Sequence, residues 1–322
     1  MDGVLVIDKP AGLTSHDVVA RVRKILKQRS VGHLGTLDPL ATGVLPIVVG
    51  RMTRLTQFYT SAEKSYQGEI CFGVETDTYD AAGEPAGPVK PVELTLEQVR
   101  QAARNFVGVI EQVPPPFSAK KIAGVPAYKL ARKKKEVPLQ PVKVEVKEFE
   151  IGSLRGDRAQ FRAHVASGTY LRSIAHDLGG LLEVGGHLAA LRRTQVGEFK
   201  EGDAVGLEAL EAAYSGSPDS SLHNIRYRTL HGSSESSESS GFFIHPRHLL
   251  PAFPSVTATP EALTKVRHGN AVNLPEVSRS RYVKVFDGQT QLIAIAMRIA
   301  GTLFQPKVVM VGDEAPAAIV AD

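Results

Sequence analysis

The spacing of apolar positions changes along this chain and predicts both strands and helices. Residues 4–7 form a short apolar run before a Pro-Gly turn, which is typical of a buried strand. Residues 14–28 repeat apolar positions at helical spacing, and Thr14 or Ser15 can serve as the N-cap. Because strands and helices are mixed without regular alternation, the pattern favours an α+β fold over a doubly wound parallel sheet.

Further elements follow from the same periodicities. Alternating or apolar runs predict strands at 65–74, 142–152 and 159–167, and helical spacing predicts helices at 95–106 and 169–183. The second helix should bury a stripe made of Leu171, Ile174, Leu178 and Leu181. Glycines and a proline between residues 30 and 45 predict a loop there, with at most a short helix after Pro39.

The composition changes beyond about residue 213, and this change suggests that the chain has two parts. Residues 215–241 contain ten serines, and such a segment cannot bury enough apolar surface to fold alone, so we expect a disordered insertion. A capped helix at 259–269 and several short strands follow, which suggests a small β-barrel. We therefore expect one domain over residues 1–252 and a second over residues 253–322.

Composition and motifs exclude several classes of protein. With 43% hydrophobic and 22% charged residues, the chain resembles an ordinary globular protein, and no apolar run approaches the length of a membrane span. Residues 1–10 carry acids where a secretion signal would be basic, and Cys71 is the single cysteine, so we expect a cytoplasmic protein. Apart from the loose pair His245 and His248, the ten histidines show no metal-binding spacing. No phosphate or dinucleotide loop is present either, so we expect no metal and no cofactor.

Positive charge is concentrated in one segment. From Pro114 to Lys135 the chain has seven Lys or Arg residues and no acid, although the net charge is only +4. This segment is either a solvated loop or an arm that contacts nucleic-acid phosphates. The candidate phosphate-binding residues are Lys120, Lys121, Lys133, Lys134 and Lys135.

Asp38 stands out because it lies between a leucine and a proline in the stretch "GHLGTLDPLATGVL". With Pro39 at a first helical position, its carboxylate would cap a helix and stay ionised. Alternatively, Asp38 is a reactive group. Nearby glycines let a ligand approach the backbone, and the apolar neighbours make an unpaired carboxylate costly unless a cation lies beside it. A buried carboxylate that stays charged suits covalent catalysis.

Several blocks of the sequence resemble the TruB family of tRNA pseudouridine synthases. They include "GVLVIDKPAGLTSHDVV" at 3–19, "GHLGTLDPLATGVLPIVVGR" at 32–51, "KSYQGEICFGVETDTYDAAGE" at 64–84 and "SGTYLRSIAHDLG" at 167–179. The resemblance covers nearly all of residues 3–200. It implies a pseudouridine synthase fold, with a mixed, largely antiparallel sheet flanked by helices, and a smaller PUA-like β-barrel at the C-terminus. The segment at about 110–140 looks like the RNA-gripping insertion of TruB.

The resemblance also implies roles for individual residues. Asp38 would be the catalytic nucleophile that isomerises uridine to pseudouridine at position 55 in the TΨC arm of tRNA. Arg172 would pair with Asp38, and Tyr66 would stack on the flipped-out uracil and assist removal of the proton from C5. Tyr170 and Leu191 would line the uracil pocket, and His33 would fill the gap that the flipped nucleotide leaves.

Alternatives to this reading concern the substrate and the activity. The chain could modify another RNA, could work within a guide-RNA particle, or could bind RNA without catalysis. The basic segment argues against a guide-dependent enzyme, and intact Asp38, Tyr66 and Arg172 argue against a non-catalytic protein. We therefore expect a monomer that binds tRNA, with no guide RNA and no membrane. Whether the carboxylate attacks C6 of the base or C1′ of the sugar stays open.

Overall fold

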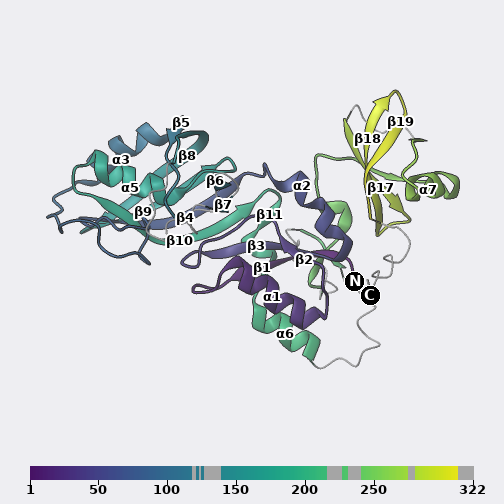
Figure 1. The fold of residues 1–322 in the computed structure, drawn as a ribbon, viewed down its shortest axis with the longest axis horizontal. Coiled ribbons are helices and arrows are strands. Elements are labelled where there is room, and N and C mark those ends of the chain that lie inside the picture. The colour runs from purple at the N-terminus through teal and green to yellow at the C-terminus, as the bar shows by residue number, and fades with distance from the viewer. Residues whose placement is uncertain are drawn as a thin grey trace.

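The described residues form a large and a small β-sheet, each with its own helices, and a separate two-stranded sheet (Figure 1). The computed structural model describes residues 1–117, 139–215, 227–230, 241–274 and 280–310, and the backbone of β6 (Lys121–Ile122) and β7 (Val125–Pro126). The large sheet uses residues up to 244, and the small sheet begins at residue 255.

The N-terminal elements match the expected local signals. β1 (Gly3–Lys9) is almost entirely buried, and α1 (Ser15–Leu26) begins with a capping box between Thr14 and Asp17. Since Thr14 and Asp17 serve this cap, the run "TSHD" is a helix start. The prediction of a loop across residues 30–45 was partly wrong, because β2 (Val31–His33) and β3 (Thr42–Val49) occupy both ends of that range. The two strands pair with each other, and their backbone hydrogen bonds stabilise extended structure despite the glycines.

The large sheet is mixed and mostly antiparallel, as expected. Its strand order is β13-β14-β1-β3-β10-β4-β9-β8-β5, with β2, β11 and β12 attached to the side. Parallel pairs join β3 to β10, β1 to β12 and β13 to β14. The remaining strands are β4 (Lys64–Phe72), β5 (Gly108–Gln112), β8 (Val142–Arg155), β9 (Arg158–Val165), β10 (Gly186–Val196), β11 (Phe199–Lys200), β12 (Ala204–Val205), β13 (Tyr227–Arg228) and β14 (Phe243–Ile244).

Two pairs of helices cover different halves of this sheet (Figure 1). α3 (Leu96–Ala103) and α5 (Leu171–Leu181) pack on the half built from β4, β8, β9 and β10, where their apolar faces bury one hydrophobic core. α1 and α6 (Leu207–Ser215) cover the half around β1 and β3. Thr95 and Gln98 form the predicted capping box of α3. In α5 the predicted stripe is buried except for Leu181, which is 53% exposed in the last turn.

The small sheet forms the C-terminal part, curled as expected for a PUA-like domain. Its strand order is β15-β17-β18-β19-β16, and α7 (Pro260–Arg267) packs on it after the predicted cap, Thr259. Gly269 follows the helix with a φ of 74°, a left-handed conformation that glycine adopts without strain. The strands are β15 (Ser255–Thr257), β16 (Val272–Asn273), β17 (Tyr282–Asp287), β18 (Gln291–Ala300) and β19 (Leu303–Val309).

The two sheets share a hydrophobic cluster, so the C-terminal part is docked against the large sheet. Val4 and Val196 from the large sheet lie in the same buried cluster as Phe286 and Ile295 from the small one. The connecting turns η1 (Gly50–Leu55) and α2 (Thr56–Tyr59) lie at this junction. Short 3₁₀ turns complete the described part of the chain: η2 (Arg104–Phe106), η3 (Glu201–Asp203) and η5 (Pro246–His248).

The serine-rich range at 215–241 lies mostly outside the described residues. Within it, Tyr227 and Arg228 form β13, which pairs with β14. At these two positions the expectation of a disordered insertion was wrong, because β14, which lies just beyond the serine-rich range, provides backbone hydrogen bonds.

Candidate active site

Asp38 lies in the loop between β2 and β3, and its neighbours in the loop are held by side chains from elsewhere. The Ser15 hydroxyl accepts a hydrogen bond from the Leu37 amide (2.8 Å) and donates one to the Leu37 carbonyl (3.1 Å). The Gly12 amide donates to the Pro39 carbonyl at 2.8 Å. The loop continues into bends and β3, not into a helix, so Asp38 caps no helix. The carboxylate is therefore available for another role.

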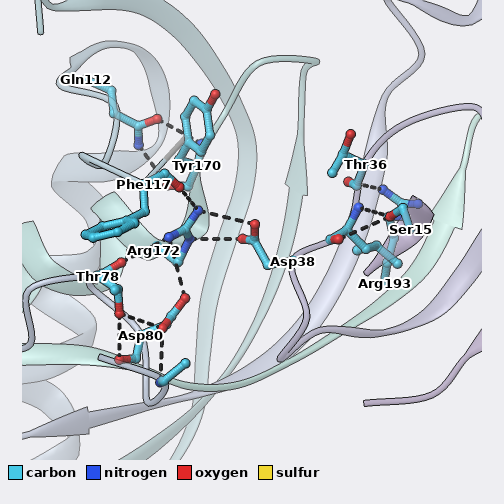
Figure 2. Close-up of polar contacts among 12 residues, drawn as sticks. Ser15, Thr36, Asp38, Thr78, Asp80, Gln112, Phe117, Tyr170, Arg172 and Arg193 are labelled. Atoms are coloured by element: carbon cyan, nitrogen blue, oxygen red, sulfur yellow. Dashed lines mark hydrogen bonds and ion pairs between the residues drawn. The ribbon is translucent and has the colours of Figure 1, made fainter. Parts of the chain in front are cut away.

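Arg172 supplies the cation that an acid in this position needs. It is the second residue of α5, and its side chain is 5% exposed, whereas that of Asp38 is 38% exposed. The Arg172 Nη2 donates to Asp38 Oδ1 at 3.3 Å, and Arg172 Nε lies 2.9 Å from Asp38 Oδ2. Figure 2 shows both contacts, with the guanidinium side-on to the carboxylate. The structure thus brings these two predicted residues together.

The same guanidinium also contacts a second carboxylate, Asp80, which the sequence analysis did not single out. Arg172 Nη1 lies 3.5 Å from Asp80 Oδ2, and the Asp80 side chain is 7% exposed. The Oδ1 of Asp80 accepts hydrogen bonds from the Thr78 hydroxyl (2.7 Å) and the Ala82 amide (3.0 Å). Arg172 further donates to the carbonyls of Thr78 (3.0 Å) and Phe117 (2.9 Å). The guanidinium is therefore fixed from several sides (Figure 2).

Burial and the neighbouring charges shift the pKa of Asp38 in opposite directions. Burial raises the pKa of the Asp38 carboxyl, and the charge of Asp80 raises it further, whereas Arg172 and Lys9 lower it. Burial of a carboxylate disfavours its charged form, and a nearby cation favours it. Burial is the largest influence, so the pKa of the Asp38 carboxyl lies above its usual value, and Arg172 is the strongest influence that opposes this rise.

Five of the predicted site residues line one cavity of about 380 Å³: Asp38, Tyr66, Tyr170, Arg172 and Leu191. A larger cavity, of about 1120 Å³, includes Leu191 in its wall, but Asp38 and Arg172 are not among its lining residues. We assign the site to the smaller cavity because the paired charges lie there. The described residues lining it do not include His33, which pairs with Ile47 between β2 and β3 and whose Nδ1 is buried without a hydrogen-bond partner.

Lys9 and Lys64, which belong to the blocks that resemble TruB, lie near the cavity. Lys9 is fully buried and donates to the carbonyls of Pro10 (2.8 Å) and Pro39 (3.3 Å), which secures the loop directly after Asp38. Lys64 lines the cavity and donates to the Ala62 carbonyl at 2.6 Å. Desolvation is the largest influence on both and lowers each pKa to about 8.

The side chains of the predicted phosphate-binding lysines lie outside the described part of the chain. Lys120, Lys133, Lys134 and Lys135 lie outside the described residues, and Lys121 is described only as a backbone position of β6. Phosphate binding by these lysines therefore stays a prediction.

The described residues contain no group of three His, Cys, Asp or Glu side chains arranged to hold a metal ion. Within the same residues, no helix is long and apolar enough to cross a membrane.

Comparison with known proteins assigns the family. The model of the TruB family pseudouridylate synthase N-terminal domain matches residues 23–171, and that of the tRNA pseudouridylate synthase B C-terminal domain matches residues 172–226. The tRNA pseudouridine synthase B of Solibacter usitatus is 46% identical over 315 residues, which cover 96% of this chain and 100% of that protein. The chain belongs to the TruB family. The TruB relative from Opitutus terrae is 46% identical over 66% of this chain and 88% of its own length.

The fold of this TruB chain is also similar to solved structures. A chain of a Cbf5-Nop10-Gar1 complex matches with a TM-score of 0.67 and 25% identity, covering 96% of this chain and 85% of the other. The expected pseudouridine synthase fold is therefore confirmed. The chain is an enzyme of the tRNA pseudouridine synthase B type, which converts uridine to pseudouridine in tRNA.

Proposed function

We propose that Asp38 is the nucleophile with which this chain isomerises uridine 55 in the TΨC arm of tRNA. The single observation that carries the proposal is the Asp38–Arg172 pair inside a cavity large enough for a pyrimidine base. A carboxylate that stays charged through a buried guanidinium partner, yet is itself partly exposed to the cavity, is suited to covalent catalysis.

The reaction is an isomerisation and balances without a co-reactant. The glycosidic bond between N1 and C1′ breaks, the uracil turns while it is held in the site, and C5 forms a bond to C1′. The proton leaves C5, and N1 of the product carries a proton in its place. Asp38 forms and then releases a covalent bond to the substrate, either at C6 of the base or at C1′ of the sugar, and both routes stay open.

We assign to the other cavity residues the roles that the resemblance to TruB implies. Tyr66 would stack on the uracil and assist proton removal from C5, and its place in the cavity wall with Asp38 supports this role. Tyr170 and Leu191 enclose the base. A stacked nucleotide hides C1′ and C6, so the substrate must be flipped out, at a cost of roughly a few kcal/mol. We keep His33 as the residue that fills the resulting gap.

RNA binding is assigned to parts of the chain outside the cavity. The basic segment at 114–135 would contact phosphates, which positions the RNA without reading its sequence. We assign catalysis to residues 1–252 and further RNA contact to residues 253–322, since the two sheets separate near this boundary. The basic segment argues against a guide-dependent enzyme, so we propose that the protein works without guide RNA. We further propose that it acts as a monomer in the cytoplasm, where tRNA is found.

An unmodified tRNA transcript tests this function. The protein is incubated with the transcript alone, and pseudouridine is mapped at single-nucleotide resolution, with a transcript carrying cytidine at position 55 as the control. We expect one pseudouridine at position 55 and none in the control transcript. Absence of pseudouridine, or modification only outside the T arm, would contradict the proposal.

A further inference from the structure

Arg193 has the largest fully buried side chain in the described structure, and it is a cation. It lies in β10, where it is paired with Tyr66 of β4 on one side and with Gly43 of β3 on the other. A side chain at position 43 would collide with this strand, because a Cβ there would lie 2.3 Å from the Arg193 carbonyl oxygen. Gly43 thus permits the close approach of β3 and β10 that buries Arg193.

The guanidinium of Arg193 is solvated by backbone carbonyls. Its Nε donates to Val44 (2.8 Å), its Nη1 to Thr36 (3.1 Å) and its Nη2 to Gly35 (3.0 Å). Among the ion pairs of the described residues, none joins Arg193 to a carboxylate. Desolvation lowers its pKa. A buried charge without a counter-ion is costly, so its retention needs a reason beyond packing.

Two of these carbonyls belong to the loop that carries Asp38. With the contacts of Ser15, Lys9 and Gly12 described above, the loop is fixed from residue 35 to residue 39. In Figure 2, Asp38 lies between Arg172 on one side and the Arg193 and Ser15 contacts on the other. Arg172 therefore holds the carboxylate end of Asp38, whereas Arg193 holds the backbone that leads to it.

Arg193 also acts on the second reactive side chain of the site. Tyr66 is the direct partner of Arg193 in the antiparallel register of β4 and β10, so the two side chains leave the sheet on the same face. The guanidinium and the phenol are therefore close enough to interact through charge. One residue thus donates to the loop of the proposed nucleophile and lies directly opposite the tyrosine that is proposed to face the uracil.

We propose that Arg193 is a positioning residue that fixes the Asp38 loop and the Tyr66 phenol relative to each other. The inference rests on the proposed roles of Asp38 and Tyr66. A flipped uracil must meet the carboxylate and the phenol at once, and errors of about 1 Å in such positioning cost roughly a hundredfold in rate. Because each nitrogen of its buried guanidinium donates to a backbone carbonyl, Arg193 acts through the Asp38 loop and Tyr66 and forms no bond to the substrate.

Variants at positions 193 and 192 test the proposal in the full-length protein. Arg192 is the matched control, because it lies on the same strand but forms ion pairs with Asp8 (2.9 Å) and Glu201 (2.5 Å) on the other side. Single-turnover isomerisation of tRNA and the Kd for tRNA are measured for Arg193→Lys, Arg193→Gln and Arg192→Gln. We expect losses of roughly tenfold or more for Arg193→Lys and roughly a hundredfold for Arg193→Gln, with Kd within about threefold of wild type.

A double-mutant cycle separates positioning from a general loss of structure. If Arg193 positions the phenol, Tyr66→Phe slows the wild type strongly but slows Arg193→Lys much less, since the interaction between the two side chains is already weakened. The cycle of Arg192→Gln with Tyr66→Phe should be multiplicative. Arg193 variants that turn over within about threefold of wild type, or that combine multiplicatively with Tyr66→Phe, would overturn the proposal.

A measurement on the intact fold covers the case in which Arg193 variants do not fold. The guanidinium ¹⁵N signals of Arg193 should resist hydrogen exchange because the group is fully buried, and they should shift in Tyr66→Phe. Signals that do not shift would overturn the contact. Failure of the wild type to modify tRNA would instead refute the proposed function, so the two failures are distinguishable.

Discussion

The substitution Arg172→Lys tests how the site keeps its nucleophile charged and aligned. A lysine preserves the positive charge but offers one nitrogen in place of the planar fork of the guanidinium. Arg172 contacts Asp38 through two nitrogens and also donates to the carbonyls of Thr78 and Phe117. One ammonium group cannot span all four contacts, so the variant loses at least one charge-assisted hydrogen bond.

The size of the effect follows from this geometry. A hydrogen bond to a charged group is worth about 1.5–3 kcal/mol. If that loss falls on the transition state, the turnover rate decreases by about 10- to 150-fold. The guanidinium is 5% exposed, so water cannot replace the lost contact easily. The loss should appear in the rate and not in tRNA affinity, since the pair faces the cavity and not the outer surface.

The assay is release of tritium from 5-tritiated uridine in tRNA under single-turnover conditions, with tRNA Kd measured separately. Arg100→Lys is a matched control, because Arg100 on α3 also donates to two carbonyls, those of Ile151 (2.9 Å) and Gly152 (3.1 Å), away from the site. We expect the control to react at the wild-type rate. Arg172→Lys turning over within about threefold of wild type would refute the reasoning, since that is less than one lost charged hydrogen bond.

Three further predictions concern charge. Arg172 lowers the pKa of Asp38, so Arg172→Met should move the acid limb of the kcat/KM profile to higher pH. Asp80 raises that pKa, so Asp80→Asn should move the same limb to lower pH. Shifts of both variants in the same direction would contradict this prediction. Burial lowers the pKa of Lys284 to about 8, so the folded state releases this proton first, and stability in urea should rise between about pH 8 and 10.5. Lys284→Met should flatten that rise, and an unchanged slope would contradict the assignment. Neutralising Lys133–Lys135 should weaken tRNA binding and reduce its salt dependence; an unchanged salt slope would indicate a solvated loop.

Local signals in the sequence predicted the regular elements well. Thr14, Thr95 and Thr259 each cap the helix that follows, because a short polar side chain before a periodic apolar run satisfies the first free amides whatever the tertiary context. The alternation of apolar and polar residues at 142–152 likewise predicted the half-buried strand β8. These predictions depend on neighbours in the chain, which a sequence displays directly.

Features that depend on distant partners could not be predicted in this way. β2 lies in a glycine-rich stretch and forms because β3 provides its backbone partners. Leu181 has the right helical phase but reaches the end of α5, where packing stops. Asp80 was not singled out from the sequence, because its importance depends on Arg172, which is far away in the chain. The burial of Arg193 depends on two neighbouring strands.

For Asp38 itself, the residues gave two readings, and geometry distinguishes them. The helix-cap reading fails because no helix follows Pro39 in the described loop. The reactive reading required a cation in an apolar setting, and Arg172 meets that requirement. The family resemblance identified the partner, and physical reasoning from the local sequence identified only the need for one.

The most direct test of the account is tritium release by Asp38→Asn, with Asp157→Asn as the control, because Asp157 is an exposed acid in the turn between β8 and β9. Asparagine keeps the shape of the side chain but removes the nucleophilic charge. We predict that Asp38→Asn binds tRNA with near wild-type Kd and releases no tritium, while the control reacts normally. Tritium release by Asp38→Asn at a rate near that of wild type would contradict the assignment of Asp38 as the nucleophile.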